Sequence, residues 1–70
     1  MNSVRFNHSS LNFDIDKLMA FDNLNVSTTE EYHLEYPFVI EVNDSSYFYA
    51  SRKDRDADFI KLKKCIKYNH

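Results

Sequence analysis

The chain has no glycine and no tryptophan among its 70 residues, and it has one proline and one cysteine. Average glycine usage of about 7% would give roughly five glycines at this length. Phosphate-binding loops of the P-loop and G-x-G-x-x-G types need glycine, because a Cβ atom would keep the backbone away from the phosphates. The lack of glycine therefore excludes nucleotide-binding enzymes of these two classes.

Cysteine is nearly absent as well, and with Cys65 alone no disulfide can form within the chain. A lone thiol in a sequence without a secretory signal is typical of a reducing compartment, so we expect a cytoplasmic protein. Long apolar runs are also missing. The mid-chain run at residues 36–40 is far shorter than the ~20 residues of a membrane-spanning helix. We expect one small domain, residues 1–70, with no membrane partner.

Charge is divided unequally along the chain. Residues 1–44 contain eight acidic and two basic residues, whereas residues 45–70 contain three acidic and seven basic residues. The two parts therefore carry opposite formal charges, and the whole chain sums to −2. Such a distribution indicates that the two parts prefer different partners, or each other.

Alternation of apolar and polar residues predicts a strand over residues 32–42. Tyr32 and every second residue after it are apolar or aromatic, while the residues between them are mostly polar. This period of two is typical of a half-buried strand. Pro37 has no N–H group, so it places the strand at a sheet edge or marks a bulge. Residues 43–46 have the composition of a turn, and a second arm then completes a hairpin from Tyr32 to Ser51.

The length of that turn decides which side chains of the hairpin face the core. A three-residue connection buries Phe48 and Ala50 and directs Tyr47 and Tyr49 outward. A two- or four-residue connection does the reverse, because a slip of one residue exchanges the faces. Burying two tyrosine hydroxyls is costly, which favours the first register. We therefore expect a protein-binding surface on the outer face of the hairpin, with these members: Tyr47, Tyr49, Glu35, Glu41 and Val39.

A C-terminal amphipathic helix is predicted over residues 56–68. Asp54 or Asp56 is suited to cap it, and acidic residues there complement the positive end of the helix dipole. Four residues that recur at helical spacing form its apolar side: Phe59, Leu62, Cys65 and Ile66. The predicted fold is thus α+β, with a small antiparallel sheet of two to four strands packed against this helix.

The N-terminal third allows two interpretations. Apolar residues alternate with polar ones between residues 4 and 15, which is consistent with a hairpin followed by a short helix over residues 17–23. Alternatively, Asn12 or Asp14 caps one longer helix that ends near residue 23. Residues 23–29 are polar and are expected to form a connector.

Metal and catalytic signals are weak. Asp54, Asp56 and Asp58 have the spacing of the first EF-hand ligands, but Phe59 and Cys65 stand where that loop needs glycine and glutamate. We therefore interpret the three aspartates as helix-capping residues and predict no metal site and no cofactor. His8 and His33 are candidate bases, yet nothing in their spacing joins them to a nucleophile or a phosphate-holding group. A small toxin-type ribonuclease is accordingly only the third hypothesis, and we expect no enzyme.

The basic residues of the second part of the chain are the second candidate site. Cations with nearby aromatic residues are typical of nucleic-acid-binding surfaces. The whole-chain pI of about 5.8 argues against such a role. The nucleic-acid-binding candidates are Arg52, Lys53, Arg55, Lys61, Lys64 and Lys67.

The leading hypothesis is a non-catalytic protein-binding module. The abundance of Asn, Lys, Tyr, Phe, Ile and Ser resembles translation of an AT-rich gene, which favours a small regulator or inhibitor encoded by a phage or other mobile element. We expect it to bind a host protein complex in the cytoplasm, with a nucleic-acid-binding accessory protein as the alternative. A homodimer is also compatible with so small a core.

Overall fold

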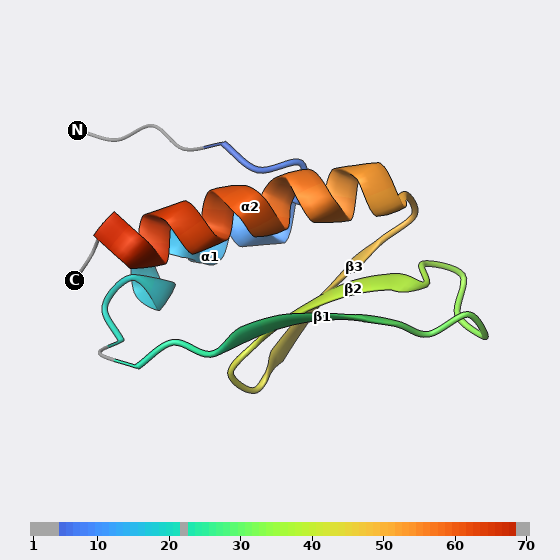
Figure 1. The fold of residues 1–70 in the computed structure, drawn as a ribbon, viewed down its shortest axis with the longest axis horizontal. Coiled ribbons are helices and arrows are strands. Elements are labelled where there is room, and N and C mark those ends of the chain that lie inside the picture. Colours follow the sequence, from blue (N-terminus) through green and yellow to red (C-terminus); the bar gives the residue numbers. More distant parts are fainter. Residues whose placement is uncertain (1–4, 22, 69–70) are drawn as a thin grey trace.

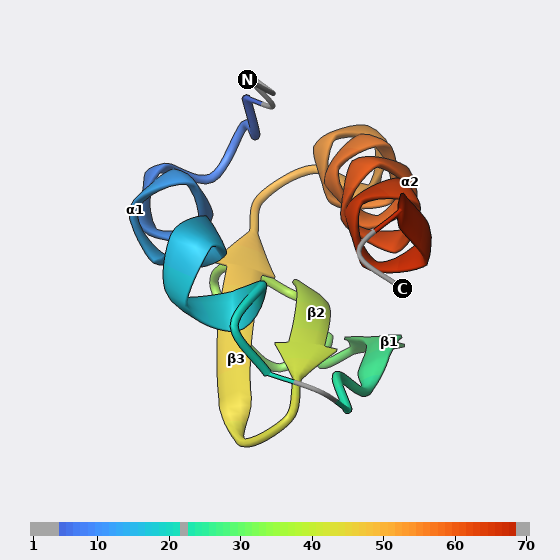
Figure 2. The same ribbon diagram turned by 90° about the vertical axis from the view of Figure 1, so that its left-hand side faces the viewer.

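The computed structural model describes residues 5–21 and 23–68, although not the side chains of residues 67–68. The element order is α1 (Ser9–Leu18), β1 (Val26–Glu30), β2 (Phe38–Val42), β3 (Ser45–Tyr49) and α2 (Arg52–Tyr68). The three strands form an antiparallel sheet in the order β1-β2-β3. Among the described residues, both helices cover the same face of this sheet and none lies on the opposite face (Figure 1, Figure 2). The predicted α+β fold, with a small sheet packed against a C-terminal helix, is confirmed.

The hydrophobic core lies between the sheet and the two helices. Ile40 at the centre of β2 and Leu62 in α2 are both fully buried. Leu11 and Leu18 bring α1 onto the same cluster, and Phe6 closes it from the N-terminal side. The predicted apolar side of the C-terminal helix is confirmed, because Phe59, Cys65 and Ile66 pack against this cluster around Leu62.

The β2–β3 turn has two residues, not three, and the predicted register is therefore wrong. Val42 pairs with Ser45, which leaves Asn43 and Asp44 as the connection. Asn43 has a φ of 52°, a left-handed conformation that asparagine tolerates better than most residues and that two-residue hairpin turns require.

Tyr47 and Tyr49 consequently face the core, where they are 4% and 5% exposed, and Phe48 faces outward. Burying the two tyrosine hydroxyls would cost free energy if they had no partners, but each of them forms a hydrogen bond. Tyr47 donates its hydroxyl proton to Asp14, and Tyr49 donates to Asp58.

The predicted strand over residues 32–42 is also too long. Only Phe38–Val42 forms β2, and Glu31 and Pro37 are joined by a backbone hydrogen bond at the base of the β1–β2 connection. The alternating apolar residues of the connection, Tyr32, Leu34 and Tyr36, are exposed. The strand that pairs with β2 on this side is β1, and all but its last residue, Glu30, lie in the segment that was expected to be a connector.

The helices begin earlier than predicted. Helix α1 starts at Ser9, and His8 caps it by accepting a hydrogen bond from the Ser10 N–H on Nδ1. The interpretation with one longer helix is therefore right for the later part of α1 but begins and ends it too late, and the hairpin interpretation is wrong for this segment. Val4 lies outside the described residues. Helix α2 starts at Arg52, and the Ser51 hydroxyl accepts a long hydrogen bond from the Asp54 N–H. Ser51 therefore takes the capping position assigned to Asp54 or Asp56.

Candidate protein-binding groove

The five residues predicted to form one protein-binding surface do not lie together. Tyr47 and Tyr49 are buried beneath the helices, and Val39 is buried on the opposite face of the sheet. Glu41 is exposed on that opposite face, and Glu35 is exposed in the β1–β2 connection. The expectation that the two tyrosines point outward is wrong, because the two-residue turn places them beside Phe38 and Ile40.

The predicted nucleic-acid-binding residues are also divided. Arg55 is 4% exposed, and its guanidinium pairs with Glu30 at 3.0 Å and with Asp56 at 2.7 Å. Arg52 is exposed but donates a hydrogen bond to the Tyr32 hydroxyl. Lys53, Lys61 and Lys64 are exposed, with Lys61 donating to the Arg5 carbonyl oxygen, and the side chain of Lys67 lies outside the described part.

Arg55 fixes one end of β1 to the beginning of α2. Besides its two ion pairs, it donates to the carbonyl oxygen of Thr29 and lies over the Phe38 ring. Burial alone would lower the pKa of this guanidinium, but the hydrogen bonds to Asp56 and Glu30 outweigh it and raise the pKa. The hydrogen bond from Arg55 is also the main reason why the pKa of Glu30 is lowered. Arg55 is therefore a structural residue in this fold.

Asp58 has a structural role that the sequence did not indicate. It is fully buried and accepts hydrogen bonds from the backbone N–H groups of Asn7 and His8, at 2.8 and 3.0 Å. The Tyr49 hydroxyl donates to the same carboxylate at 2.6 Å. Asp58 thus holds the segment leading into α1, whereas Asp54 and Asp56 are exposed. The three aspartates do not converge on one metal-binding position.

The two candidate bases belong to separate clusters. His8 packs edge-on against Tyr47 and Tyr49, with ring centroids 5.4 and 5.1 Å away, and its Nδ1 is occupied by the cap of α1. His33 is exposed and lies 3.8 Å from Glu31 in the β1–β2 connection. The two histidines therefore do not share one site.

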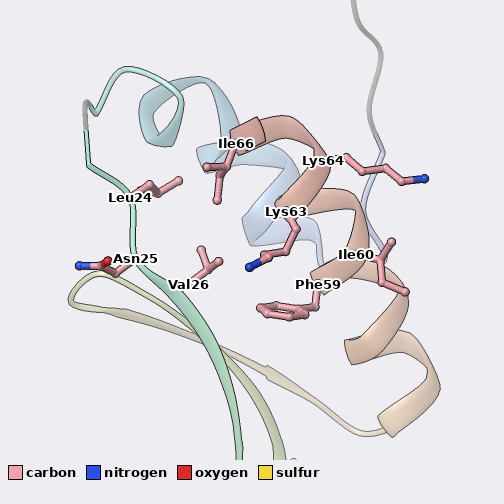
Figure 3. A pocket seen from close by; sticks show the side chains of 8 residues that line it. All are labelled: Leu24, Asn25, Val26, Phe59, Ile60, Lys63, Lys64 and Ile66. Atoms are coloured by element: carbon pink, nitrogen blue, oxygen red, sulfur yellow. The ribbon is translucent and has the colours of Figure 1, made fainter. Parts of the chain in front are cut away.

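An open groove of about 700 Å³ lies between α2 and the start of β1. Its apolar walls are Leu24 and Val26 on one side and Phe59 and Ile66 on the other, and all four are partly buried. In Figure 3 the Phe59 ring and Val26 face the same space, and the Lys63 side chain extends over it. The Lys63 ammonium lies 5.7 Å from the centroid of the Phe59 ring. The remaining lining residues are Asn25, Ile60 and Lys64.

The groove combines an apolar interior with a cationic rim. Lys63 is exposed and extends over the groove, whereas Lys64 and Ile60, which is 56% exposed, direct their side chains away from Leu24 and Val26 (Figure 3). Within the described residues, neither of these lysines has an ion pair with an acidic side chain. The sequence indicated Lys64 as a candidate nucleic-acid-binding residue but did not reveal the groove, because Leu24 and Val26 lay in the presumed connector.

No family model matches the chain, and neither the curated proteins nor the solved structures contain a match. Among the described residues, no helix has both the length and the apolar character needed to cross a membrane.

Proposed function

We propose that the chain is a non-catalytic protein-binding module and that its contact site is the groove between α2 and β1. The observation that carries this proposal is the apolar interior of Leu24, Val26, Phe59 and Ile66 beneath the Lys63 side chain, which extends over it (Figure 3). Exposed apolar surface rimmed by polar residues is typical of interaction sites. The cationic rim favours a partner segment that carries acidic residues beside its apolar anchors, because complementary charge speeds association and restricts the choice of partner.

We propose a small regulator or inhibitor of a host protein complex, encoded by a phage or other mobile element and active in the cytoplasm. The residue usage and the absence of a glycine loop support this setting. The groove adds a defined surface through which such a regulator would act.

The proposal is tested by comparing partner capture between two charge reversals on the same helix. Lys63→Glu changes the groove rim, and Lys53→Glu makes the same change at an exposed position outside the groove. We expect a stoichiometric partner to be captured from lysate of the source cells by the wild type and by Lys53→Glu. We expect Lys63→Glu to lose it, and capture that is equal for both variants would contradict the proposal.

A nucleic-acid-binding function is the second candidate, favoured by three exposed lysines near the end of α2: Lys61, Lys63 and Lys64. It is weaker because Arg55 is buried in ion pairs and Arg52 is held by Tyr32. Nucleic-acid binding falls steeply with salt, with a slope of about 0.9 per phosphate contact. Capture that is removed by nuclease and shows such a slope would replace the protein-binding proposal.

A further inference from the structure

The edge strand β1 leaves half of its backbone groups directed away from the sheet. Asn43 N–H donates to the Asn25 carbonyl, and Glu31 N–H donates to the Pro37 carbonyl. In an antiparallel ladder, hydrogen-bonded pairs alternate along the strands. Those two bonds therefore place the backbone groups of Ser27 and Thr29 toward β2. The N–H and C=O groups of the alternate residues, including Thr28, point to the open side of the sheet.

This edge lacks several of the features that usually protect an edge strand, although it is five residues long and ends in the charged Glu30, which pairs with Arg55. Lysine, proline and bulges are common there, and Val26–Glu30 contains neither lysine nor proline and pairs with β2 in continuous register. In the described part of the chain, β1 ends the strand order, and Figure 2 shows α2 above it, with no element beyond it. The sequence of β1 is rich in β-branched residues, which suits strand pairing.

The groove lies on the helix side of this same edge. Val26 contributes both its side chain to the groove and its backbone to the free edge. A segment paired with β1 would place every second side chain on the helix side of the sheet, beneath α2. Those side chains would meet the apolar interior around Phe59, and carboxylates at the groove mouth would meet Lys63. At the other end of β1, Arg55 donates hydrogen bonds to the Thr29 carbonyl oxygen and to Glu30, so the proposed site ends there.

We propose that an extended, acidic segment of a partner protein adds to the free edge of β1 as a fourth strand, with alternate apolar side chains in the groove. This inference rests on the proposed function and specifies its binding mode. Strand addition of this kind takes affinity from main-chain hydrogen bonds and specificity from the pockets that receive alternate side chains. A helical partner segment would instead present apolar residues at i, i+3, i+4 and i+7.

The binding mode is tested with a displayed library of random dodecapeptides. Peptides are selected for binding to the wild type, and those that also bind the Lys63→Glu variant are then removed. We expect enriched peptides to carry apolar residues at every second position together with Asp or Glu. Helical spacing would overturn strand addition while leaving the groove as the binding site. Failure to enrich any Lys63-dependent peptide would count against both proposals.

Two further measurements distinguish strand addition from binding of a helical segment without relying on the sequence pattern of the selected peptides. N-methylation of the best peptide, one position at a time, should weaken binding by about tenfold or more at alternate positions and little between them. Binding should also slow amide hydrogen exchange at Thr28 but not at Thr29, which already pairs with β2. Uniform sensitivity to N-methylation, or no change at Thr28, would contradict strand addition.

The edge can also be blocked directly. Thr28→Pro removes the free N–H, and edge strands accept proline where that group faces solvent. We expect this variant to keep the fold and lose peptide binding. If it unfolds, the N-methylation series still decides the question. Concentration-dependent dimerisation of the chain that protects the Thr28 amide would assign the edge to a second copy instead.

Discussion

The two long sides of α2 are built in different ways. Toward the N-terminal segment, Asp58 accepts three hydrogen bonds, and Lys61 donates to the Arg5 carbonyl oxygen. Toward β1, the helix presents Phe59, Ile60 and Lys63 to an open groove. We call these the closed side and the open side. Directional polar contacts fix the arrangement of the closed side, whereas the apolar contacts of the open side are less directional, as the proposed exchange with a partner chain requires.

The largest effect is expected from removing the central acceptor of the closed side. Asp58→Asn replaces one acceptor oxygen by an NH₂ group that faces backbone donors. We expect a loss of about 3 kcal/mol in the free energy of unfolding, because buried donors are left without an acceptor. Urea denaturation measures this loss. The matched control is Asp54→Asn, an exposed residue of the same helix, for which we expect a change below about 1 kcal/mol.

A double-mutant cycle sharpens this prediction. Tyr49→Phe removes the hydroxyl that donates to Asp58. If the two residues stabilise the fold through that bond, the losses from Asp58→Asn and Tyr49→Phe will not add. Additive losses would show that Asp58 acts through the backbone donors and not through Tyr49, and a stable Asp58→Asn variant would show that the closed side does not depend on this carboxylate.

The next effect concerns Arg55, which joins α2 to β1 beside the groove through its ion pair with Glu30 and its hydrogen bond to Thr29. Arg55→Met keeps part of the packing against Phe38 but removes the ion pairs, and we expect a loss of about 1–2 kcal/mol near neutral pH. The lowered pKa of Glu30 adds a pH dependence. Stability from this contact is present above the pKa of an unfolded glutamate, about 4.3, and is lost as the pH falls through the lower folded value.

The stability difference between the wild type and Arg55→Met should therefore be larger at about pH 7 than at about pH 3. Glu30→Gln is the matched control, because it removes the titrating group while leaving Arg55 in place. Urea denaturation of the three proteins at both pH values tests the prediction. An equal Arg55→Met loss at both values would indicate that the arginine acts through packing alone.

A smaller effect is expected at the cap of α1. His8→Ala removes the acceptor for the Ser10 N–H and the ring that contacts Tyr47 and Tyr49. We expect a loss of about 1 kcal/mol, with partial recovery in His8→Asn, because asparagine also caps helices. Thermal unfolding of both variants provides the comparison. Equal stability of His8→Ala and the wild type would show that the closed side tolerates fraying of α1.

The sequence predicted the parts of the fold that depend on local pattern. The apolar side of α2 was correct because its spacing is helical, and the β2–β3 hairpin was correct because strong β-formers flank a turn. The predicted register of this hairpin was wrong because the free-energy cost of burying Tyr47 and Tyr49 depends on their hydrogen-bond acceptors. These acceptors, Asp14 and Asp58, lie on the two helices and not on the hairpin itself. No local pattern reports such pairings.

The candidate site was missed for a related reason. The groove needs Leu24 and Val26 beside Phe59 and Ile66, a proximity that exists only once β1 pairs with β2. The Val-Ser-Thr-Thr run of β1 has β-branched residues that indicate a strand, but it lacks clear alternation. The exposed lysines were noticed, yet their position over an apolar groove is a tertiary feature.

The smallest effect on stability is expected on the open side. Lys63→Gln removes the cation over the Phe59 ring, and Lys64→Gln removes an exposed charge. Exposed cation–π contacts contribute about 0.5–1 kcal/mol and other surface charges less, so each variant should unfold within about 1 kcal/mol of the wild type. Lys53→Gln, outside the groove, is the control in the same urea experiment. A loss from Lys63→Gln as large as that from Asp58→Asn would mean that the open side stabilises the fold, which would leave it poorly suited to exchange its contacts for those of a partner.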